Sequence, residues 1–215
     1  MKKLYLLPNI LHEESPWRYT PPSIDALIAE SHKGGYLFLK KFALPSVPIY
    51  LLNEHTKDIE ELLALTENTV GLISDAGLPC LADPGSVMVE RAFKKGIEVE
   101  AIPGPSSITM ALQLSGFSGQ LFTFHGYFPR EEHDIAKLPK TLHPLYTHLF
   151  IETPYKLEKT FQKLLKFFPS TVKIGVALEL MSPSSFVEVH SVAEWKKKSL
   201  PYPKARGVIL IHFTK

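Results

Sequence analysis

Two loops of small and rigid residues each follow a short apolar run, and this arrangement limits what the chain can fold into. The first loop, residues 74–85, reads Ser-Asp-Ala-Gly-Leu-Pro-Cys-Leu-Ala-Asp-Pro-Gly and follows the run 70–73. The second, residues 102–107, reads Ile-Pro-Gly-Pro-Ser-Ser and follows the run 98–102. Short apolar runs bounded by glycine and proline predict buried strands. We therefore expect both loops at the carboxyl edge of one α/β sheet, where such sheets bind ligands.

The first half of the chain alternates predicted strands with predicted helices. The predicted strands cover residues 4–7, 26–29, 48–52, 70–74 and 99–102, and the helices lie near residues 35–42, 58–65, 86–95 and 107–114. This alternation indicates a mostly parallel sheet with helices on both faces.

The second half predicts another domain of the same class. Residues 115–119, Ser-Gly-Phe-Ser-Gly, are typical of a linker. Strands are expected at residues 121–125, 148–151, 172–178, 186–190 and 208–213, with a clear helix at 157–167. The predicted fold class is thus α/β, with a mostly parallel N-terminal domain over residues 1–115 and a mixed-sheet C-terminal domain over residues 120–215. A cofactor is expected in the cleft between them.

Composition fits a soluble enzyme of the cytoplasm. The 215 residues are 45% hydrophobic, which is enough for a sizeable core. No apolar stretch approaches the roughly 20 residues that span a bilayer, and the apolar run near the N-terminus is too short for a signal peptide. A single cysteine, Cys80, excludes an internal disulfide and suits a reducing compartment. Its small side chain is expected to fill space rather than to react.

Several other chemistries leave no trace in the sequence. No Gly-x-Gly-x-x-Gly follows the first predicted strand, and no Walker-type loop occurs, which argues against a classical dinucleotide fold or a P-loop enzyme. The nine histidines are scattered without metal-binding spacing, so no metal site is predicted. Gly-x-Ser-x-Gly is also absent, so nothing supports an acyl-transfer serine.

The residue types in the two loops indicate a small polar ligand. Their glycines allow backbone N–H and C=O groups to approach a ligand closely, and their prolines keep the loops stiff. Asp75 and Asp83 are short acceptors for hydroxyl or ammonium groups, and Ser106 opens a predicted helix whose N-terminus can receive an anion. This mixture suits a zwitterionic nucleoside. Each segment alone is also an ordinary turn sequence, so a purely structural role stays open for either loop.

These motifs resemble a known family. The pattern Ser-Asp-Ala-Gly-x-Pro-x-x-x-Asp-Pro-Gly, followed by Pro-Gly-Pro-Ser at 103–106, is similar to the S-adenosylmethionine-dependent tetrapyrrole methylase superfamily. Within it, the match is to the branch that includes the small-subunit ribosomal RNA cytidine 2′-O-methyltransferase. The resemblance is strong over residues 69–129 and continues through 151–155, 177–180 and 207–211.

The resemblance implies S-adenosyl-L-methionine as the cofactor, RNA as a substrate and a homodimer. The residues expected at the cofactor are Pro8, Asp75, Ala76, Gly77, Pro79, Asp83, Pro84, Gly85, Ser106, Ser107, Glu152 and Thr153.

Two segments depart from the family pattern. Relatives follow their first strand with Thr-Pro-Ile-Gly-Asn-Leu, whereas residues 8–12 read Pro-Asn-Ile-Leu-His without a glycine. Relatives also carry Glu-Asp-Thr-Arg where residues 30–33 read Glu-Ser-His-Lys. Both segments contribute to the substrate side in relatives, so the methyl acceptor stays open.

No catalytic group is assigned from the sequence alone. A ribose hydroxyl is a weak acid, and its methylation favours a nearby base or cation. The candidates on loops after early strands are Glu30, His32, Lys33, Glu54 and His55, with Glu152 and Glu179 as alternatives in the second half. Each is equally suited to a surface, capping or structural role.

The formal net charge of +2 is only mildly basic, but the lysines cluster. One cluster is Lys196, Lys197 and Lys198, and the other is Lys156, Lys159, Lys163 and Lys166 at helical spacing. Such a stripe either follows RNA phosphates or is an ordinary solvated face.

Three functions are compatible with the sequence. The first is an S-adenosylmethionine-dependent methyltransferase acting on RNA. The second is a methylase of a tetrapyrrole or another small molecule, although the many carboxylates of a tetrapyrrole would need more positive charge than this chain shows. The third is a cofactor-binding protein without catalysis. The altered segments 8–12 and 30–33 support this alternative.

Overall fold

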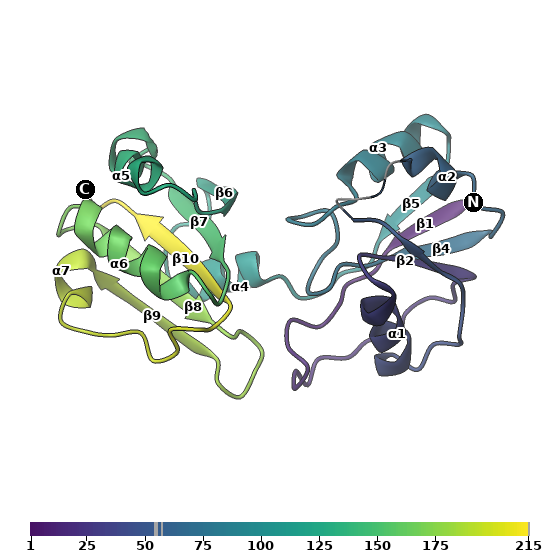
Figure 1. The fold of residues 1–215 in the computed structure, drawn as a ribbon, viewed down its shortest axis with the longest axis horizontal. Helices are drawn as coiled ribbons and strands as arrows, with labels where there is room; N and C mark the ends of the chain where they lie inside the picture. Colours follow the sequence, from purple (N-terminus) through teal and green to yellow (C-terminus); the bar gives the residue numbers. More distant parts are fainter. Residues whose placement is uncertain (54–55, 57, 215) are drawn as a thin grey trace. The chain divides into compact units, whose positions relative to one another are not determined.

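The computed structural model describes residues 1–53, 56 and 58–214, and the chain divides into two compact units, Met1–Ser106 and Ser107–Lys215. Each unit contains its own five-stranded sheet (Figure 1). The expected boundary near residues 115–120 differs from this division. The reason is the helix α4 (Ser107–Ser115), which contacts strands of the second sheet and so belongs to the second unit.

The first unit contains a parallel sheet, as its alternating sequence predicts. Its strands are β1 (Lys3–Leu6), β2 (Ala26–Ala29), β3 (Ile49–Leu51), β4 (Thr69–Leu72) and β5 (Glu98–Ala101). They are arranged in the order β3-β2-β4-β1-β5, and every neighbouring pair is parallel. The interior strand β2 reads Ala-Leu-Ile-Ala and is buried throughout, as expected for a strand covered on both faces.

Helices cover both faces of this sheet (Figure 1). On one face α1 (His32–Lys41) buries Phe38 and Leu39 in a cluster with Leu27. On the other face α2 (Ile59–Leu63) and α3 (Ser86–Lys94) pack against the alternate strand residues, with Met88 and Leu4 fully buried. The arrangement predicted from the sequence is confirmed.

The second unit contains a mixed sheet, also as predicted. Its strands are β6 (Phe122–Tyr127), β7 (Thr147–Glu152), β8 (Lys173–Leu178), β9 (Phe186–Ser191) and β10 (Gly207–His212). Their order is β6-β7-β10-β8-β9, with β6 parallel to β7 and the other pairs antiparallel. α4 packs on β10, β8 and β9, and the remaining helices share the main hydrophobic cluster of the unit.

Two helices of the second unit do not follow from the sequence pattern. α5 (Glu132–Thr141) contains Pro139 and buries only Ile135, so its apolar stripe is weak. α7 (Val192–Trp195) is too short to show a period, although a capping box formed by Ser191 and Glu194 marks its start. The clear prediction was α6 (Leu157–Phe167), whose apolar face is buried as its spacing requires. No helix in the described ranges combines the length and apolar character needed to cross a bilayer.

Two histidines form a hydrogen-bonded pair across β6 and β7. His125 Nε2 lies 2.8 Å from His148 Nδ1, and His148 Nε2 lies 2.9 Å from the carbonyl oxygen of His143. Since the carbonyl can only accept, His148 donates from Nε2, and as a neutral imidazole it then accepts at Nδ1 from Nε2 of His125. Burial lowers the pKa of both side chains, and their proximity lowers the pKa of His125 further.

The stability of this unit should therefore fall in mild acid. Both histidines have lower pKa values in the fold than in the unfolded chain, so their contribution is fully present above the unfolded value of about 6.5 and is lost as the pH falls below it. We expect the melting temperature followed by circular dichroism to decline between about pH 7 and pH 5. The decline should be smaller in His148→Gln, which cannot titrate, and unchanged in the exposed His133→Gln. Equal declines in all three proteins would contradict this assignment.

Candidate functional site

The carboxyl ends of four neighbouring parallel strands bring the predicted loops together in the first unit. β2, β4, β1 and β5 are adjacent and run in the same direction. The segments that follow them begin at Glu30, at Ile73, at Leu7 and at Ile102. Both predicted loops therefore share one edge of the sheet with the segment after the first strand, as the sequence predicted.

Asn9 ties the segment after β1 to the first loop. Its backbone N–H donates to the carbonyl oxygen of Gly77 at 2.7 Å. Its side-chain Nδ2 donates to the carbonyl oxygens of Ser74 and Asp75 at 3.0 and 3.1 Å. The side chain is buried, so these bonds fix the backbone of the loop. The sequence did not single out Asn9, and its only signal was an amide residue two positions after a predicted strand.

Pro8 and Gly104 approach each other closely at the same edge. A Cβ atom on Gly104 would lie 2.1 Å from Cβ and 2.6 Å from Cγ of Pro8, so only glycine fits there. In the first loop Gly85 has φ of +137°, and a Cβ atom on it would lie 2.7 Å from Sγ of Cys80. Burial raises the pKa of the Cys80 thiol to about 11, which keeps it protonated, in agreement with a space-filling role.

Three carboxylates gather at this edge. Glu30 Oε1 accepts a hydrogen bond of 3.0 Å from the backbone N–H of Asp75. Burial raises the pKa of Glu30, and the negative charges of Asp83 and Asp75 raise it further. The hydrogen bond from Asp75 acts in the opposite direction and lowers it. The pKa of Asp83 is raised by burial and by Asp75, against a hydrogen bond from Ser74. Mutually repelling carboxylates of this kind favour a cation.

Two other candidate catalytic groups, His32 and Lys33, lie on the first turn of α1. Ser31 caps α1 by accepting from the N–H of Gly34 at 2.9 Å, which places His32 and Lys33 exposed on the first helical turn. The structure therefore brings Glu30 to the predicted loop and leaves His32 and Lys33 at the surface. Glu54 and His55 lie outside the described residues.

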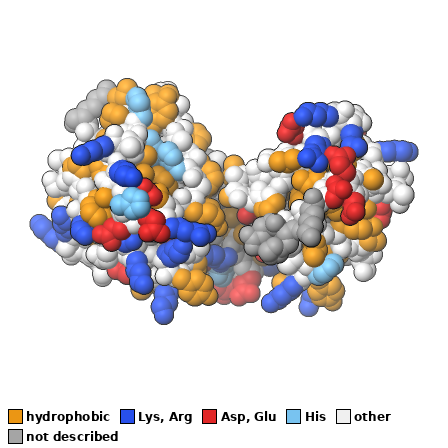
Figure 2. All heavy atoms as spheres, turned by 45° about the horizontal axis from the view of Figure 1, so that its top comes forward, with side chains coloured by type: hydrophobic (Ala, Val, Ile, Leu, Met, Phe, Trp, Pro, Cys, Tyr) orange, Lys and Arg blue, Asp and Glu red, His pale blue; other side chains and the backbone are white. Residues whose placement is uncertain are grey.

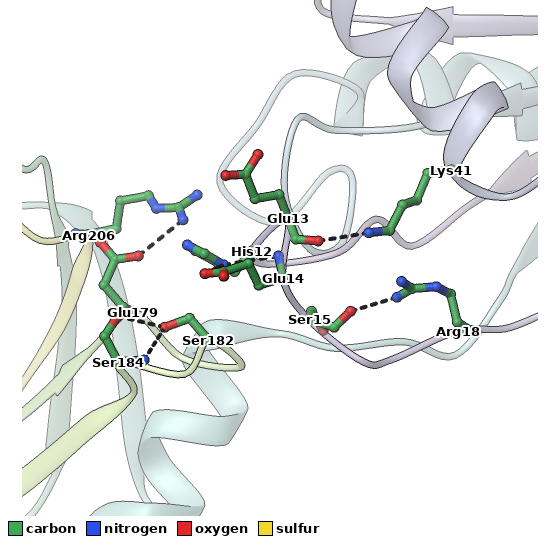
Figure 3. Close-up of polar contacts among 10 residues, drawn as sticks. All are labelled: His12, Glu13, Glu14, Ser15, Arg18, Lys41, Glu179, Ser182, Ser184 and Arg206. Atoms are coloured by element: carbon green, nitrogen blue, oxygen red, sulfur yellow. Dashed lines mark hydrogen bonds and ion pairs between the residues drawn. The ribbon is translucent and has the colours of Figure 1, made fainter.

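The segment after β1 is also held to α1. Lys41 Nζ of α1 donates to the carbonyl oxygen of Glu13 at 2.8 Å (Figure 3). Within the segment, Arg18 donates to the carbonyl oxygen of Ser15 at 2.6 Å. Relatives carry a glycine-bearing sequence in the first part of this segment, and here Asn9 and these contacts fix its course. The departure in sequence leaves the segment ordered.

The other loop residues predicted at the cofactor differ in exposure. Pro8, Gly77, Pro79, Gly85 and Ser106 are buried, whereas Asp75, Ala76 and Pro84 are exposed. Buried members shape the loop, and exposed members are free to meet a ligand. Among the residues that the structure describes, no group of three histidine, cysteine or acidic side chains is placed to hold a metal ion.

The predicted site residues of the second unit have partners within that unit. Ser107 is the first residue of α4. The Glu152 carboxylate is buried, accepting from the Thr153 N–H at 2.8 Å and from the Thr160 hydroxyl at 2.7 Å. This links the end of β7 to α6. Glu152 therefore has a structural role that the sequence did not distinguish from ligand binding.

Glu179 is another candidate whose carboxylate is engaged locally. It accepts from the backbone N–H of Arg206 at 2.7 Å and from its guanidinium at 3.1 Å (Figure 3). Its φ of +44° and the φ of +64° at Met181 lie in the left-handed region, which is costly for residues with a side chain. These contacts hold the strained turn after β8.

Comparisons with known proteins agree with this arrangement. A model of the family Tetrapyrrole (Corrin/Porphyrin) Methylases matches residues 14–194. A Thermotoga maritima protein named ribosomal RNA small subunit methyltransferase I is 34% identical over 147 residues, which are 66% of this chain and 66% of that protein. A protein of the same name from Leptospira borgpetersenii is 32% identical over 196 residues, covering 87% of this chain and 77% of that protein.

Solved structures with the same fold have little sequence identity to this chain. A diphthine synthase superimposes with a TM-score of 0.67 at 14% identity, covering 98% of this chain and 89% of the other. A uroporphyrin-III-C-methyltransferase from Thermus thermophilus superimposes with a TM-score of 0.61 at 17% identity, covering 99% and 94%. These likenesses show the fold, which the sequence had predicted.

Proposed function

The chain belongs to the tetrapyrrole methylase family, and on that premise we propose that it transfers the methyl group of S-adenosyl-L-methionine to RNA. The observation that carries the cofactor assignment is the gathering of Glu30, Asp75 and Asp83 at the carboxyl edge of the parallel sheet. S-adenosylmethionine carries a sulfonium and an ammonium group, and both would relieve the repulsion among these carboxylates.

The choice of RNA as acceptor is supported by sequence relatives rather than by fold. The relatives at 32–34% identity are named as methyltransferases of ribosomal RNA, whereas the structures named for uroporphyrin share 17% identity and indicate the fold alone. We therefore propose ribose 2′-O-methylation of ribosomal RNA or a closely similar reaction. Methylation of a tetrapyrrole and cofactor binding without catalysis are the alternatives.

The residues proposed to contact the cofactor are those that the family resemblance implies, and each unit contributes some of them. In the first unit these are Pro8, Asp75, Ala76, Gly77, Pro79, Asp83, Pro84, Gly85 and Ser106, and in the second unit Ser107, Glu152 and Thr153. The exposed carboxylate of Asp75 would meet positive charge on the ligand. Glu152 would act through Thr153, because both of its oxygens already accept hydrogen bonds.

Among the candidate bases, the structure favours Glu30. Its pKa is raised by burial and by the neighbouring carboxylates, so it accepts a proton more readily than an ordinary glutamate. It also contacts the loop that contains Asp75. Transfer would pass the methyl group from sulfur to the acceptor oxygen, release S-adenosylhomocysteine as a neutral thioether and leave the hydroxyl proton on the base.

Calorimetric titration of Asp75→Asn tests the cofactor assignment. We expect the wild-type protein to bind S-adenosylmethionine with micromolar affinity and the variant to bind it roughly tenfold more weakly, because one carboxylate near the cationic ligand is lost. Binding of S-adenosylhomocysteine should weaken less, since its sulfur is uncharged.

The control is Asp134→Asn, which removes a partly exposed carboxylate from α5. It should bind both ligands like the wild-type protein. Equal binding by Asp75→Asn and the wild type would reject the proposed site, and no binding by the folded wild-type protein would reject the cofactor.

The proposal includes two further expectations. A reducing, cytoplasmic setting suits the single protonated cysteine. A homodimer is expected by analogy with the family.

A further inference from the structure

Two lysine-rich segments that are distant in the sequence lie side by side in the second unit. Gln162 and Lys166 of α6 line an open hollow of about 490 Å³ together with Trp195, Lys196 and Lys198. Figure 2 shows lysine and arginine side chains gathered on this unit, on the left of the view. We call the combined feature the lysine surface. It is defined by the lysines of the two segments, of which Lys166, Lys196 and Lys198 line the hollow. Its members are Lys156, Lys159, Lys163, Lys166, Lys196, Lys197 and Lys198.

Only part of this positive charge is neutralised. Lys166 Nζ lies 2.9 Å from Glu132, which also lies 3.9 Å from Lys163, and Lys198 lies 3.1 Å from Glu188. Four lysines are exposed and form no ion pair within 4.0 Å among the described residues, namely Lys156, Lys159, Lys196 and Lys197. Cations that no carboxylate already compensates are available to an external anion.

The anion that fits this surface is a chain of phosphates rather than a lipid bilayer. A membrane-binding helix needs an apolar face to enter the lipid, but Leu157, Phe161 and Leu164 on the apolar face of α6 are fully buried. Trp195 is also buried and donates from Nε1 to the carbonyl oxygen of Ile174 at 2.8 Å. Of the three lysines that line the hollow, Lys166 and Lys198 are paired with carboxylates, and Lys196 forms no ion pair among the described residues. Such an ammonium group interacts with phosphate without reading the base.

An aromatic side chain stands at one end of the lysine surface. Tyr155 is 90% exposed and directly precedes Lys156, the N-cap residue of α6. A tyrosine ring so exposed makes few contacts with its own unit. Exposed aromatic rings beside a basic surface stack on unpaired bases of single-stranded nucleic acids.

We propose that the lysine surface, with Tyr155 at its end, binds the backbone of single-stranded RNA without regard to sequence. The inference rests on the proposed function, which makes RNA the methyl acceptor. It assigns binding of that RNA to the second unit. Lys159, Lys196 and Lys197 contact phosphates, and Tyr155 stacks on one base.

Fluorescence anisotropy with a labelled oligouridine of about 20 nucleotides tests the surface. The protein is titrated at several salt concentrations between about 50 and 200 mM. The test variant is Lys159→Gln/Lys196→Gln/Lys197→Gln. The control is Lys2→Gln/Lys40→Gln/Lys140→Gln, which removes the same charge from exposed lysines elsewhere. A third protein, Tyr155→Ala, tests the stacking.

The test variant should bind the RNA at least roughly tenfold more weakly, and its slope of log affinity against log salt should be shallower by about 2. Tyr155→Ala should lose roughly tenfold in affinity with an unchanged slope, because stacking releases no counterions. The control should stay within about twofold of the wild type. Equal losses in the test variant and the control would overturn the proposal, because net charge alone would then explain binding.

Two further measurements separate this inference from the proposed function. The test variant should keep the wild-type affinity for S-adenosylmethionine in calorimetry. If the wild-type protein binds the RNA through the lysine surface yet transfers no methyl group to ribosomal RNA, the RNA-binding surface stands and the methylation proposal fails. Stronger binding to phosphatidylserine vesicles than to oligouridine would instead overturn the choice of RNA.

Discussion

Gly104→Ala is expected to remove most of the affinity for S-adenosylmethionine. The added Cβ would lie 2.1 Å from Cβ of Pro8, a distance at which one of the two segments must move. Pro8 has a rigid ring and lies two residues after the end of β1, so the strain falls on the sheet edge that forms the proposed site. Overpacking of this size costs about 1–3 kcal/mol, which corresponds to roughly fivefold to 150-fold weaker binding if the site must bear it. Calorimetric titration measures the loss.

Gly119→Ala is the matched control for this prediction. A Cβ atom there would lie 3.5 Å from the nearest side chain, an ordinary contact, and Gly119 belongs to the second unit. We expect this variant to bind like the wild type. A double variant, Pro8→Gly/Gly104→Ala, removes both atoms that the new methyl group meets and should recover part of the affinity. If Gly104→Ala binds normally while folded, the contact with Pro8 does not shape the cofactor site.

Trp195→Ala is expected to destabilise the second unit by about 3–5 kcal/mol. The indole is fully buried. Its ring centroid lies 5.2 Å from that of Phe161, in an edge-on arrangement, and 4.8 Å from that of His190. Removing it leaves a cavity in the main cluster and deprives the Ile174 carbonyl of its donor. Hydrogen exchange followed by mass spectrometry should show faster exchange in peptides from β8 and β10, with peptides from β1 and β4 unchanged.

Two further substitutions serve as comparisons for Trp195→Ala. Trp195→Phe keeps an aromatic ring in the cluster and loses the hydrogen bond, so its effect should be smaller. Phe93→Ala removes a ring that is 63% exposed on α3 and should leave exchange in the second unit unchanged. A small effect of Trp195→Ala would mean that α7 is not anchored through the indole.

Much of the fold was available from local pattern. The apolar runs such as Ala-Leu-Ile-Ala in β2 and the alternation of strands with helices predicted a parallel sheet with two covered faces. The spacing of apolar residues in α6 predicted its buried face. The sequence did not predict α5, because Pro139 and a weak apolar stripe obscure its helical period. It did not predict α7, because a helix of four residues is too short to show a period. The helix α4 was recognised, but its assignment to a unit depends on contacts with distant strands.

The sequence by itself determined the class of fold, the edge of the sheet that forms the candidate site and the family resemblance, because each depends on short-range pattern and residue type. Only the tertiary structure decided which side chains meet. Asn9 bonds to Ser74 across 65 positions of the chain, Glu30 bonds to Asp75 across 45, and Pro8 meets Gly104. The order and register of parallel strands set these contacts, and loops 74–85 and 102–107 carry no local signal of the register.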